Sequence, residues 1–89
     1  MADLLERRWT VSILVASHEG ALRFNEFLQM LGSVPPATLA SRLNELEGAG
    51  VLARDVVDSR PPRVEYRLTE RGERLGTVIA ALQRFALAE

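Results

Sequence analysis

The sequence contains no cysteine and no lysine, and its only histidine is His18. Without cysteine the chain forms no disulfide, no zinc site with thiolate ligands and no thiol-based redox switch. One histidine and scattered carboxylates supply too few ligands for a metal ion, so we expect neither a metal nor a cofactor. Because lysine is absent, all eleven basic residues are arginine.

Long hydrophobic runs are also missing. No stretch approaches the roughly 18 apolar residues that a membrane-spanning helix needs, and the first residues do not resemble a signal peptide. We therefore expect a cytoplasmic protein without a membrane partner. A length of 89 residues and a hydrophobic content of 47% are typical of one folded domain, which we expect to cover residues 1–89.

Catalytic patterns are absent as well. The sequence has no serine, histidine and aspartate arrangement of a hydrolase, no glycine-rich phosphate loop and no convincing pair of carboxylates. We therefore do not expect an enzyme. The net charge of −1 argues against a strong non-specific nucleic-acid binder, unless the arginines gather on one face and the acids on another.

The first part of the chain has a helical pattern. Apolar residues recur at helical spacing over residues 3–17, which predicts one continuous first helix. Residues 22–24 are short and extended, and we expect them to form a small strand that pairs with a later hairpin. Asn25 is a good N-cap for a second helix that runs through about Leu31.

A third helix is expected over about residues 36–47. Pro36 fits its first turn, where the missing N–H group has no partner to lose. Leu39, Leu43 and Leu46 recur at helical spacing and predict its buried side. Two helices joined by a tight turn at residues 32–36 form the helix-turn-helix pattern.

A charged hairpin and a last helix follow. Residues 51–57 and 63–68 predict two strands with a tip at residues 58–62, because the second segment alternates strictly between apolar and charged residues. Thr69 is expected to cap the last helix. That helix has apolar residues every three or four positions: Leu75, Val78, Ile79, Leu82 and Phe85. The predicted fold is mainly α with a small β-wing, a winged helix-turn-helix with an additional C-terminal dimerisation helix.

These segments resemble the HxlR-type winged helix-turn-helix transcriptional regulators, which are related to the MarR group. The resemblance covers nearly the whole chain, and its most specific motif is Pro-Pro-Arg-Val-Glu-Tyr at residues 61–66, followed by Leu-Thr-x-x-Gly at residues 68–72. Four other segments match the family less specifically: residues 8–10, which read Arg-Trp-Thr, and residues 22–27, 39–47 and 50–54. The resemblance implies a dimeric bacterial or archaeal regulator that binds operator DNA, with the third helix in the major groove and the wing beside it.

The sequence departs from the family pattern in three places. An N-terminal arm that often carries a reactive cysteine is missing or shortened, so the thiol-sensing mechanism of some members does not apply. Pro35 and Pro36 stand where the family usually has a serine cap and a polar residue. Ala37 and Ala40 replace polar or basic side chains that commonly face DNA.

Three candidate DNA-binding residues lie on the third helix. Thr38 and Ser41 are early in the helix, where they can donate hydrogen bonds to phosphates or bases; the alternative is that they are small solvated residues. Arg42 has two roles of equal weight. It can reach a base edge or a phosphate, or it can pair with Glu45 at i+3 spacing.

Two further candidates are Arg60 and Arg63, which flank the diproline at the wing tip. Proline stiffens this tip and lowers the ordering cost of a contact, so we expect both arginines to bind phosphates or the minor groove. Arg54 and Arg67 lie within the strands. We expect these two to face each other across the wing and to be neutralised by nearby acids rather than to bind DNA.

The first and last helices carry more apolar surface than one small core needs, which favours a homodimer formed through them. The expected function is therefore a homodimeric DNA-binding transcriptional regulator. The alternative is a winged-helix protein-interaction module that has lost DNA binding, which the near-neutral charge and the apolar start of the third helix would explain. The sequence leaves open whether a small-molecule effector binds.

Overall fold

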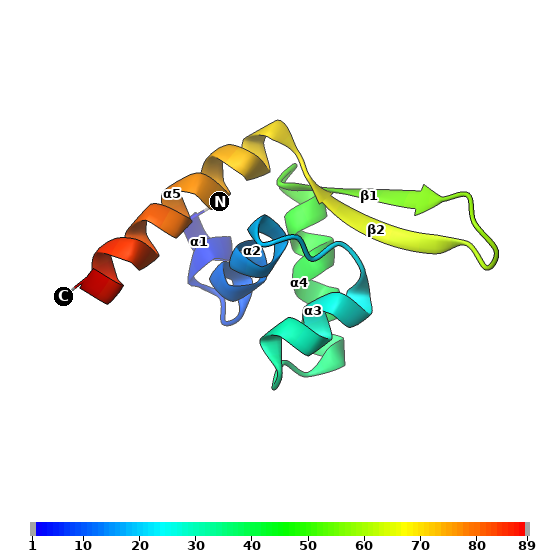
Figure 1. Cartoon of the computed structure of the whole chain (residues 1–89), viewed down its shortest axis with the longest axis horizontal. Coiled ribbons are helices and arrows are strands. Elements are labelled where there is room, and N and C mark those ends of the chain that lie inside the picture. The colour runs from blue at the N-terminus through cyan, green and yellow to red at the C-terminus, as the bar shows by residue number, and fades with distance from the viewer. Residues whose placement is uncertain (1, 89) are drawn as a thin grey trace.

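The chain folds as a winged helix-turn-helix, shown by a computed structural model that describes residues 2–88 (Figure 1). Helices α1 to α4 form the body, the two-stranded wing leaves it on one side, and α5 leaves it on the opposite side. This arrangement confirms the predicted fold class. The elements are α1 Ala2–Glu6, α2 Thr10–His18, α3 Phe24–Leu31, α4 Pro36–Gly48, β1 Leu52–Val57, β2 Arg63–Leu68 and α5 Glu70–Ala88.

The expected continuous helix over residues 3–17 is wrong. The chain breaks between α1 and α2, where Trp9 has a φ of 79° in the left-handed region. The reason is a tertiary contact. The carbonyl of Arg8 leaves the helical pattern and accepts a hydrogen bond from Nε of Arg42 on α4 at 3.0 Å. Helical spacing of apolar residues continues across the break, so the sequence pattern did not reveal it.

The expected strand at residues 22–24 is also absent from the described chain. Only one backbone hydrogen bond joins this segment to the wing, from Tyr66 N to the Leu22 carbonyl at 2.7 Å. Helix α3 begins at Phe24 with Arg23 as its N-cap, so Asn25 is not the cap. Instead, Glu26 reaches back and accepts hydrogen bonds from the Leu22 and Arg23 amides at 2.9 and 2.8 Å.

The carboxylate of Glu26 is exposed and has a lowered pKa. The amides of Arg23 and Leu22 are the main cause, because they donate to the charged form, and the positive charges of Arg23 and Arg63 add to the effect. The charged form of Glu26 therefore fixes the segment that enters α3 beside the wing.

The helix-turn-helix itself forms as expected. Pro36 is the first residue of α4, and the predicted leucines Leu39, Leu43 and Leu46 are fully buried. They pack in one core with Phe27 of α3 and with Ile13 and Leu14 of α2. Burying each of these side chains contributes about 1.5–3 kcal/mol, which holds α4 against the body and leaves its other side exposed.

The wing is an antiparallel pair of strands whose register runs from Leu52 opposite Leu68 to Val57 opposite Arg63. The predicted strands and tip are confirmed, with β1 starting one residue later than expected. The expectation that Arg54 and Arg67 face each other is wrong. Their partners in the register are Tyr66 and Ala53, so the two arginines lie on opposite faces of the pleated sheet. The expected neutralisation by a nearby acid is confirmed for Arg67, whose Nε lies 3.0 Å from Oδ2 of Asp55.

Thr69 caps α5 as expected. Its Oγ1 accepts a hydrogen bond from the Gly72 amide at 3.0 Å and donates to the Gly50 carbonyl at 2.6 Å. Gly72 lies so close to the Val51 carbonyl that a Cβ at this position would collide with it. The Leu-Thr-x-x-Gly motif thus joins the end of the wing, the end of α4 and the start of α5.

We expect replacement of Gly72 by alanine to lower the free energy of unfolding by about 2 kcal/mol, because the added Cβ meets backbone that has little room to move. The matched control is Gly76→Ala in the same helix. A Cβ at Gly76 would meet the ring of His18, an exposed side chain, at 3.1 Å. Urea unfolding should show the control unchanged or slightly stabilised, since alanine favours a helix over glycine. Equal stability of the two variants would contradict the close backbone contact.

Candidate nucleic-acid interface

The outward side of α4 is exposed. Ala37, Ala40, Ser41 and Asn44 are exposed and follow one another at i, i+3, i+4 and i+7, opposite the buried leucines. Helical geometry therefore lines them up on one face. This face is small and partly apolar at its start, with hydrogen-bonding groups only at Ser41 and Asn44. Asn44 is not among the residues that the sequence predicts to bind DNA.

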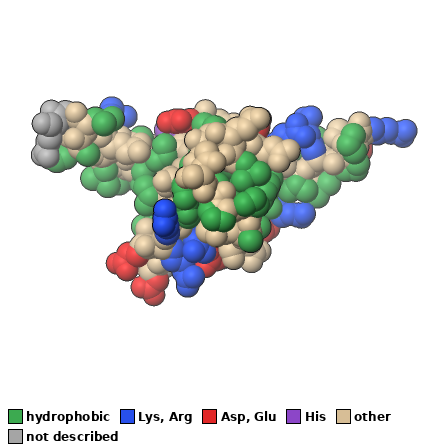
Figure 2. Space-filling view, turned by 90° about the horizontal axis from the view of Figure 1, so that it is seen from below, with side chains coloured by type: hydrophobic (Ala, Val, Ile, Leu, Met, Phe, Trp, Pro, Cys, Tyr) green, Lys and Arg blue, Asp and Glu red, His purple; other side chains and the backbone are tan. Residues whose placement is uncertain are grey.

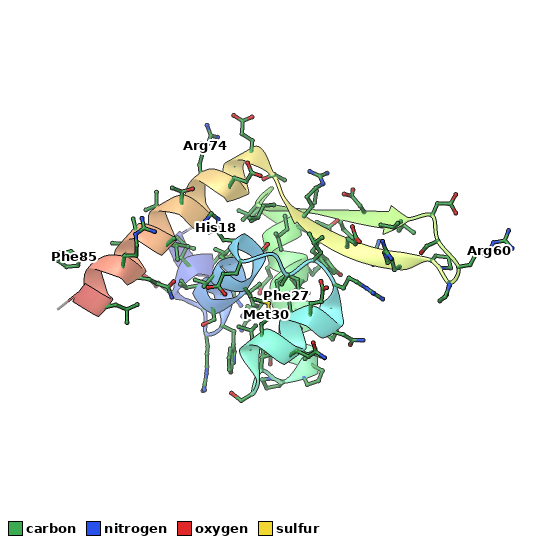
Figure 3. All side chains as sticks on the ribbon, viewed as in Figure 1. His18, Phe27, Met30, Arg60, Arg74 and Phe85 are labelled. Atoms are coloured by element: carbon green, nitrogen blue, oxygen red, sulfur yellow. The ribbon has the colours of Figure 1, made fainter. Side chains whose placement is uncertain are left out.

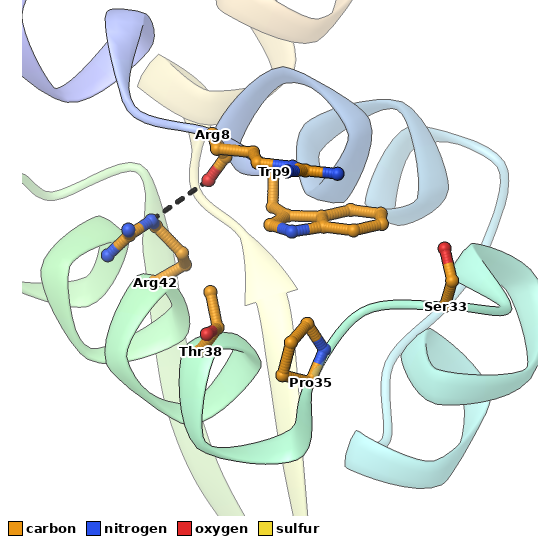
Figure 4. A pocket seen from close by; sticks show the side chains of 6 residues that line it. All are labelled: Arg8, Trp9, Ser33, Pro35, Thr38 and Arg42. Carbon is orange, nitrogen blue, oxygen red and sulfur yellow. Dashed lines mark hydrogen bonds between the residues drawn. The ribbon is translucent and has the colours of Figure 1, made fainter.

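Thr38 and Ser41 occupy different environments. Ser41 lies on the exposed face, whereas Thr38 is half-buried and lines a hollow together with Arg8, Trp9 and Arg42 (Figure 4). Both hydroxyls lie near the start of α4. DNA contact by either one stays a prediction.

Of the two roles weighed for Arg42, the structure shows the pairing with Glu45. Nη1 of Arg42 lies 2.7 Å from Oε1 of Glu45, and Nε donates to the Arg8 carbonyl at 3.0 Å. The Arg42 side chain is only 18% exposed. Glu45 also forms an ion pair with Arg7, whose Nη1 lies 3.2 Å from Oε2 of Glu45. Contact between Arg42 and DNA stays a prediction, and it would require the guanidinium to give up these bonds.

We expect Arg42→Ala to lower the free energy of unfolding by about 2 kcal/mol, because the substitution removes two hydrogen bonds and leaves the Arg8 carbonyl without its partner. Arg67→Ala is the control. Arg67 is paired at a similar distance with Asp55, but the two side chains are 58% and 48% exposed. Exposed pairs contribute about 0.5 kcal/mol, so its loss should be small. Urea unfolding of both variants measures the difference.

The wing tip presents its two candidate arginines differently. Arg60 projects from the outer end of the wing (Figure 3) and has no ion-pair partner within residues 2–88. Arg63 is 45% exposed and its Nε lies 3.2 Å from Oε2 of Glu65 on the same strand. Arg60 is therefore the freer of the two cations.

A shallow groove of about 220 Å³ separates the wing tip from the start of α3. Arg23 and Asn25 line it on the helix side, and Pro62 and Arg63 line it on the wing side. Sequence reasoning did not select Arg23, which the structure places in the lining of this groove. The signal was present, because residues 22–24 were expected to contact the wing, which brings Arg23 close to Arg63.

The end of the molecule where α3 and α4 meet has an uneven distribution of charge. Figure 2 views this end and shows hydrophobic side chains at its centre, with arginines to both sides and acidic side chains next to the arginines on one side. A net charge of −1 thus does not prevent arginines from flanking one face of the protein. In the described part of the chain, no cluster of three or more histidine, aspartate or glutamate residues is placed to hold a metal ion. No helix in that part combines the length and hydropathy needed to cross a membrane.

A model of the HxlR-like helix-turn-helix family matches residues 4–88. The chain belongs to this family. It is 36% identical over 84 residues to the uncharacterized HTH-type transcriptional regulator YvaP of Bacillus subtilis, covering 94% of this chain and 78% of YvaP. It is 44% identical over 75 residues to the uncharacterized HTH-type transcriptional regulator YtfH of Escherichia coli, covering 84% of this chain and 60% of YtfH. The chain therefore spans about three fifths of YtfH.

Solved structures agree with this assignment. The reduced form of the transcriptional regulator YodB from Bacillus subtilis superimposes with a TM-score of 0.84 at 34% identity, covering 96% of this chain and 83% of YodB. The reduced form of the redox regulator HypR superimposes with a TM-score of 0.86 at 31% identity, covering 97% of this chain and 85% of HypR. This HxlR-like chain is a DNA-binding transcriptional regulator of the helix-turn-helix type, which confirms the resemblance noted in its sequence. Unlike a thiol-based sensor, its 89 residues contain no cysteine.

Proposed function

We propose that the protein binds operator DNA as a homodimer and regulates transcription there. The α4 helices of the two protomers enter successive major grooves, roughly 34–36 Å apart, and the wings contact the flanking backbone. The observation that carries this proposal is the exposed side of α4, flanked by a wing with Arg60 at its end. The protein acts in the cytoplasm, without a cofactor and without catalysing a reaction.

The apolar surface of α5 supports the homodimer. Of its predicted hydrophobic residues only Ile79 is buried, whereas Val78, Leu82 and Phe85 are 57%, 63% and 68% exposed. Phe85 projects away from the other helices (Figure 3). Val11 of α2 is also exposed, at 40%, and together with Val78, Leu82 and Phe85 it forms an exposed apolar patch.

An apolar groove adjoins these side chains between α1, α2 and α5, lined by Leu5, Val11, Ile79, Leu82, Gln83 and Ala86. A contiguous apolar surface of this kind is typical of a subunit interface. The same surface on a second protomer makes a twofold contact that covers both patches.

Binding to a random duplex at low salt tests DNA binding directly. We expect a dissociation constant of about 1 µM or below, and an affinity that falls steeply as salt is raised. With about six phosphates neutralised per dimer, log K should fall against log salt with a slope of about −5. The alternative, a protein-interaction module without DNA binding, would explain the exposed and apolar Pro36, Ala37 and Ala40. Absence of binding at low salt would favour that alternative.

A further inference from the structure

Arg8 and Trp9 form a corner between α1 and α2 with an uncommon backbone. A bulky side chain rarely adopts a φ of 79°, yet Trp9 does so here. Arg42 holds the corner in place through its hydrogen bond to the Arg8 carbonyl. Backbone conformations of this kind cost energy and are often found at functional sites. The corner is therefore a candidate binding site in addition to α4 and the wing.

Beside the corner lies a hollow of about 420 Å³, between the start of α2 and the start of α4 (Figure 4). It is lined by Arg8, Trp9, Ser33, Pro35, Thr38 and Arg42. These residues bring two guanidinium groups, two hydroxyl groups and an indole, and no carboxylate. Cations and hydroxyl donors without an acid are the chemistry that binds an oxyanion such as a phosphate.

Arg8 is the cation available for such a ligand. Its guanidinium lies over the Trp9 ring, 5.3 Å from the ring centroid, and it has no ion-pair partner among the residues that the structure describes. Stacking on the indole orders the side chain before a ligand arrives, which lowers the cost of binding. Arg42 is already engaged by Glu45 and by the Arg8 carbonyl, so it fixes the corner rather than binding the ligand.

We propose that this hollow binds a phosphate of the DNA backbone, with Arg8 as the main donor and the hydroxyls of Ser33 and Thr38 as supporting donors. The proposal rests on the proposed function and adds a backbone contact to it. DNA is the source of the phosphate because the lining includes Ser33 of the helix-turn-helix turn and Thr38 of α4. A strand that passes α4 must run beside this turn. The corner and the wing would then hold the backbone on two sides of α4.

Trp9 provides the measurement, because it is the only tryptophan in the chain. Titration of the full chain with a labelled duplex should change Trp9 emission in parallel with the anisotropy of the DNA. We expect Arg8→Ala to weaken binding roughly 10-fold at 0.1 M salt. The salt slope should become less steep by about 1.8, since each dimer loses two phosphate contacts. Thr38→Val, which removes the hydroxyl and keeps the shape, should give a smaller loss with an unchanged slope.

Arg7→Ala is the matched control. It removes the same charge from the neighbouring residue, but Arg7 pairs with Glu45 and does not line the hollow. Equal affinity and equal slope for the two arginine variants would overturn the phosphate contact while leaving DNA binding itself intact. Failure of the unaltered protein to bind any duplex would instead overturn the proposed function. Saturable quenching of Trp9 by inorganic phosphate, with DNA binding unaffected by Arg8→Ala, would assign the hollow to a small anion and also overturn the proposal.

Discussion

Replacing Arg60 and Arg63 together by alanine is expected to weaken DNA binding roughly 100-fold at 0.1 M salt, by a similar factor for every sequence. A homodimer loses four cations in this variant, and each phosphate contact contributes about 0.9 to the slope of log K against log salt. The slope should therefore change from about −5 to about −1.5. The full electrostatic loss from four contacts would be larger, but Arg63 is partly neutralised by Glu65 in the free protein. Fluorescence anisotropy with specific and random duplexes over a range of salt concentrations measures both quantities.

The control removes the same charge from the other side of the molecule. Arg71 and Arg74 are exposed on α5, and Arg74 points away from the wing and from the turn that precedes α4 (Figure 3). Their double alanine variant should keep the original salt slope. If the wing variant retained full affinity, or if both variants lost affinity equally, the wing would not be the part of the protein that contacts the backbone.

Replacing Leu82 by glutamate should separate the protomers and lower the affinity for a full operator at least 100-fold. Leu82 is 63% exposed in the protomer, so the variant should fold normally. In a twofold interface, however, the substitution places a charge from each protomer in the apolar patch, where charges are strongly disfavoured. Linking two binding units commonly raises affinity by about 10² to 10⁴, and a monomer forfeits this gain. Sedimentation velocity measures the oligomeric state, and anisotropy measures DNA binding.

Thr77→Glu is the matched control for this interface. It adds the same charge to α5, but helical geometry places residue 77 on the side opposite Leu82. We expect this variant to remain a dimer with unchanged affinity. A Leu82→Glu protein that still sedimented as a dimer, with circular dichroism showing an intact fold, would place the interface elsewhere.

Much of the fold could be predicted because its signals are local. The spacing of Leu39, Leu43 and Leu46 identified the buried side of α4, and strict alternation in β2 identified the wing. Thr69 identified the start of α5, since a capping hydroxyl acts within three residues of its own position. The prediction of one continuous first helix failed because a distant residue contacts the backbone there. The break at Trp9 depends on Arg42, which lies 34 residues beyond its acceptor in the chain.

The candidate site was predicted less well than the fold, for a related reason. Residue type and position in α4 or at the wing tip identified Ser41 and Arg60, both of which are exposed, but they did not reveal which arginines are already paired. Arg42 and Arg63 have acidic neighbours, whereas Arg8 is stacked on an indole and has no such partner in the described chain. Sequence spacing permits several pairings for each cation, and only the packed structure selects one.

By itself, the sequence determined the order of the helix-turn-helix, the wing and the last helix, the buried side of α4 and the family to which the chain belongs. These properties follow from periodicity and from short motifs, which act over a few residues. The tertiary structure decided where the first helix breaks, which arginines remain free, and that Val78, Leu82 and Phe85 lack cover within the protomer. Such properties depend on contacts between residues far apart in the chain, whose distances no local pattern specifies.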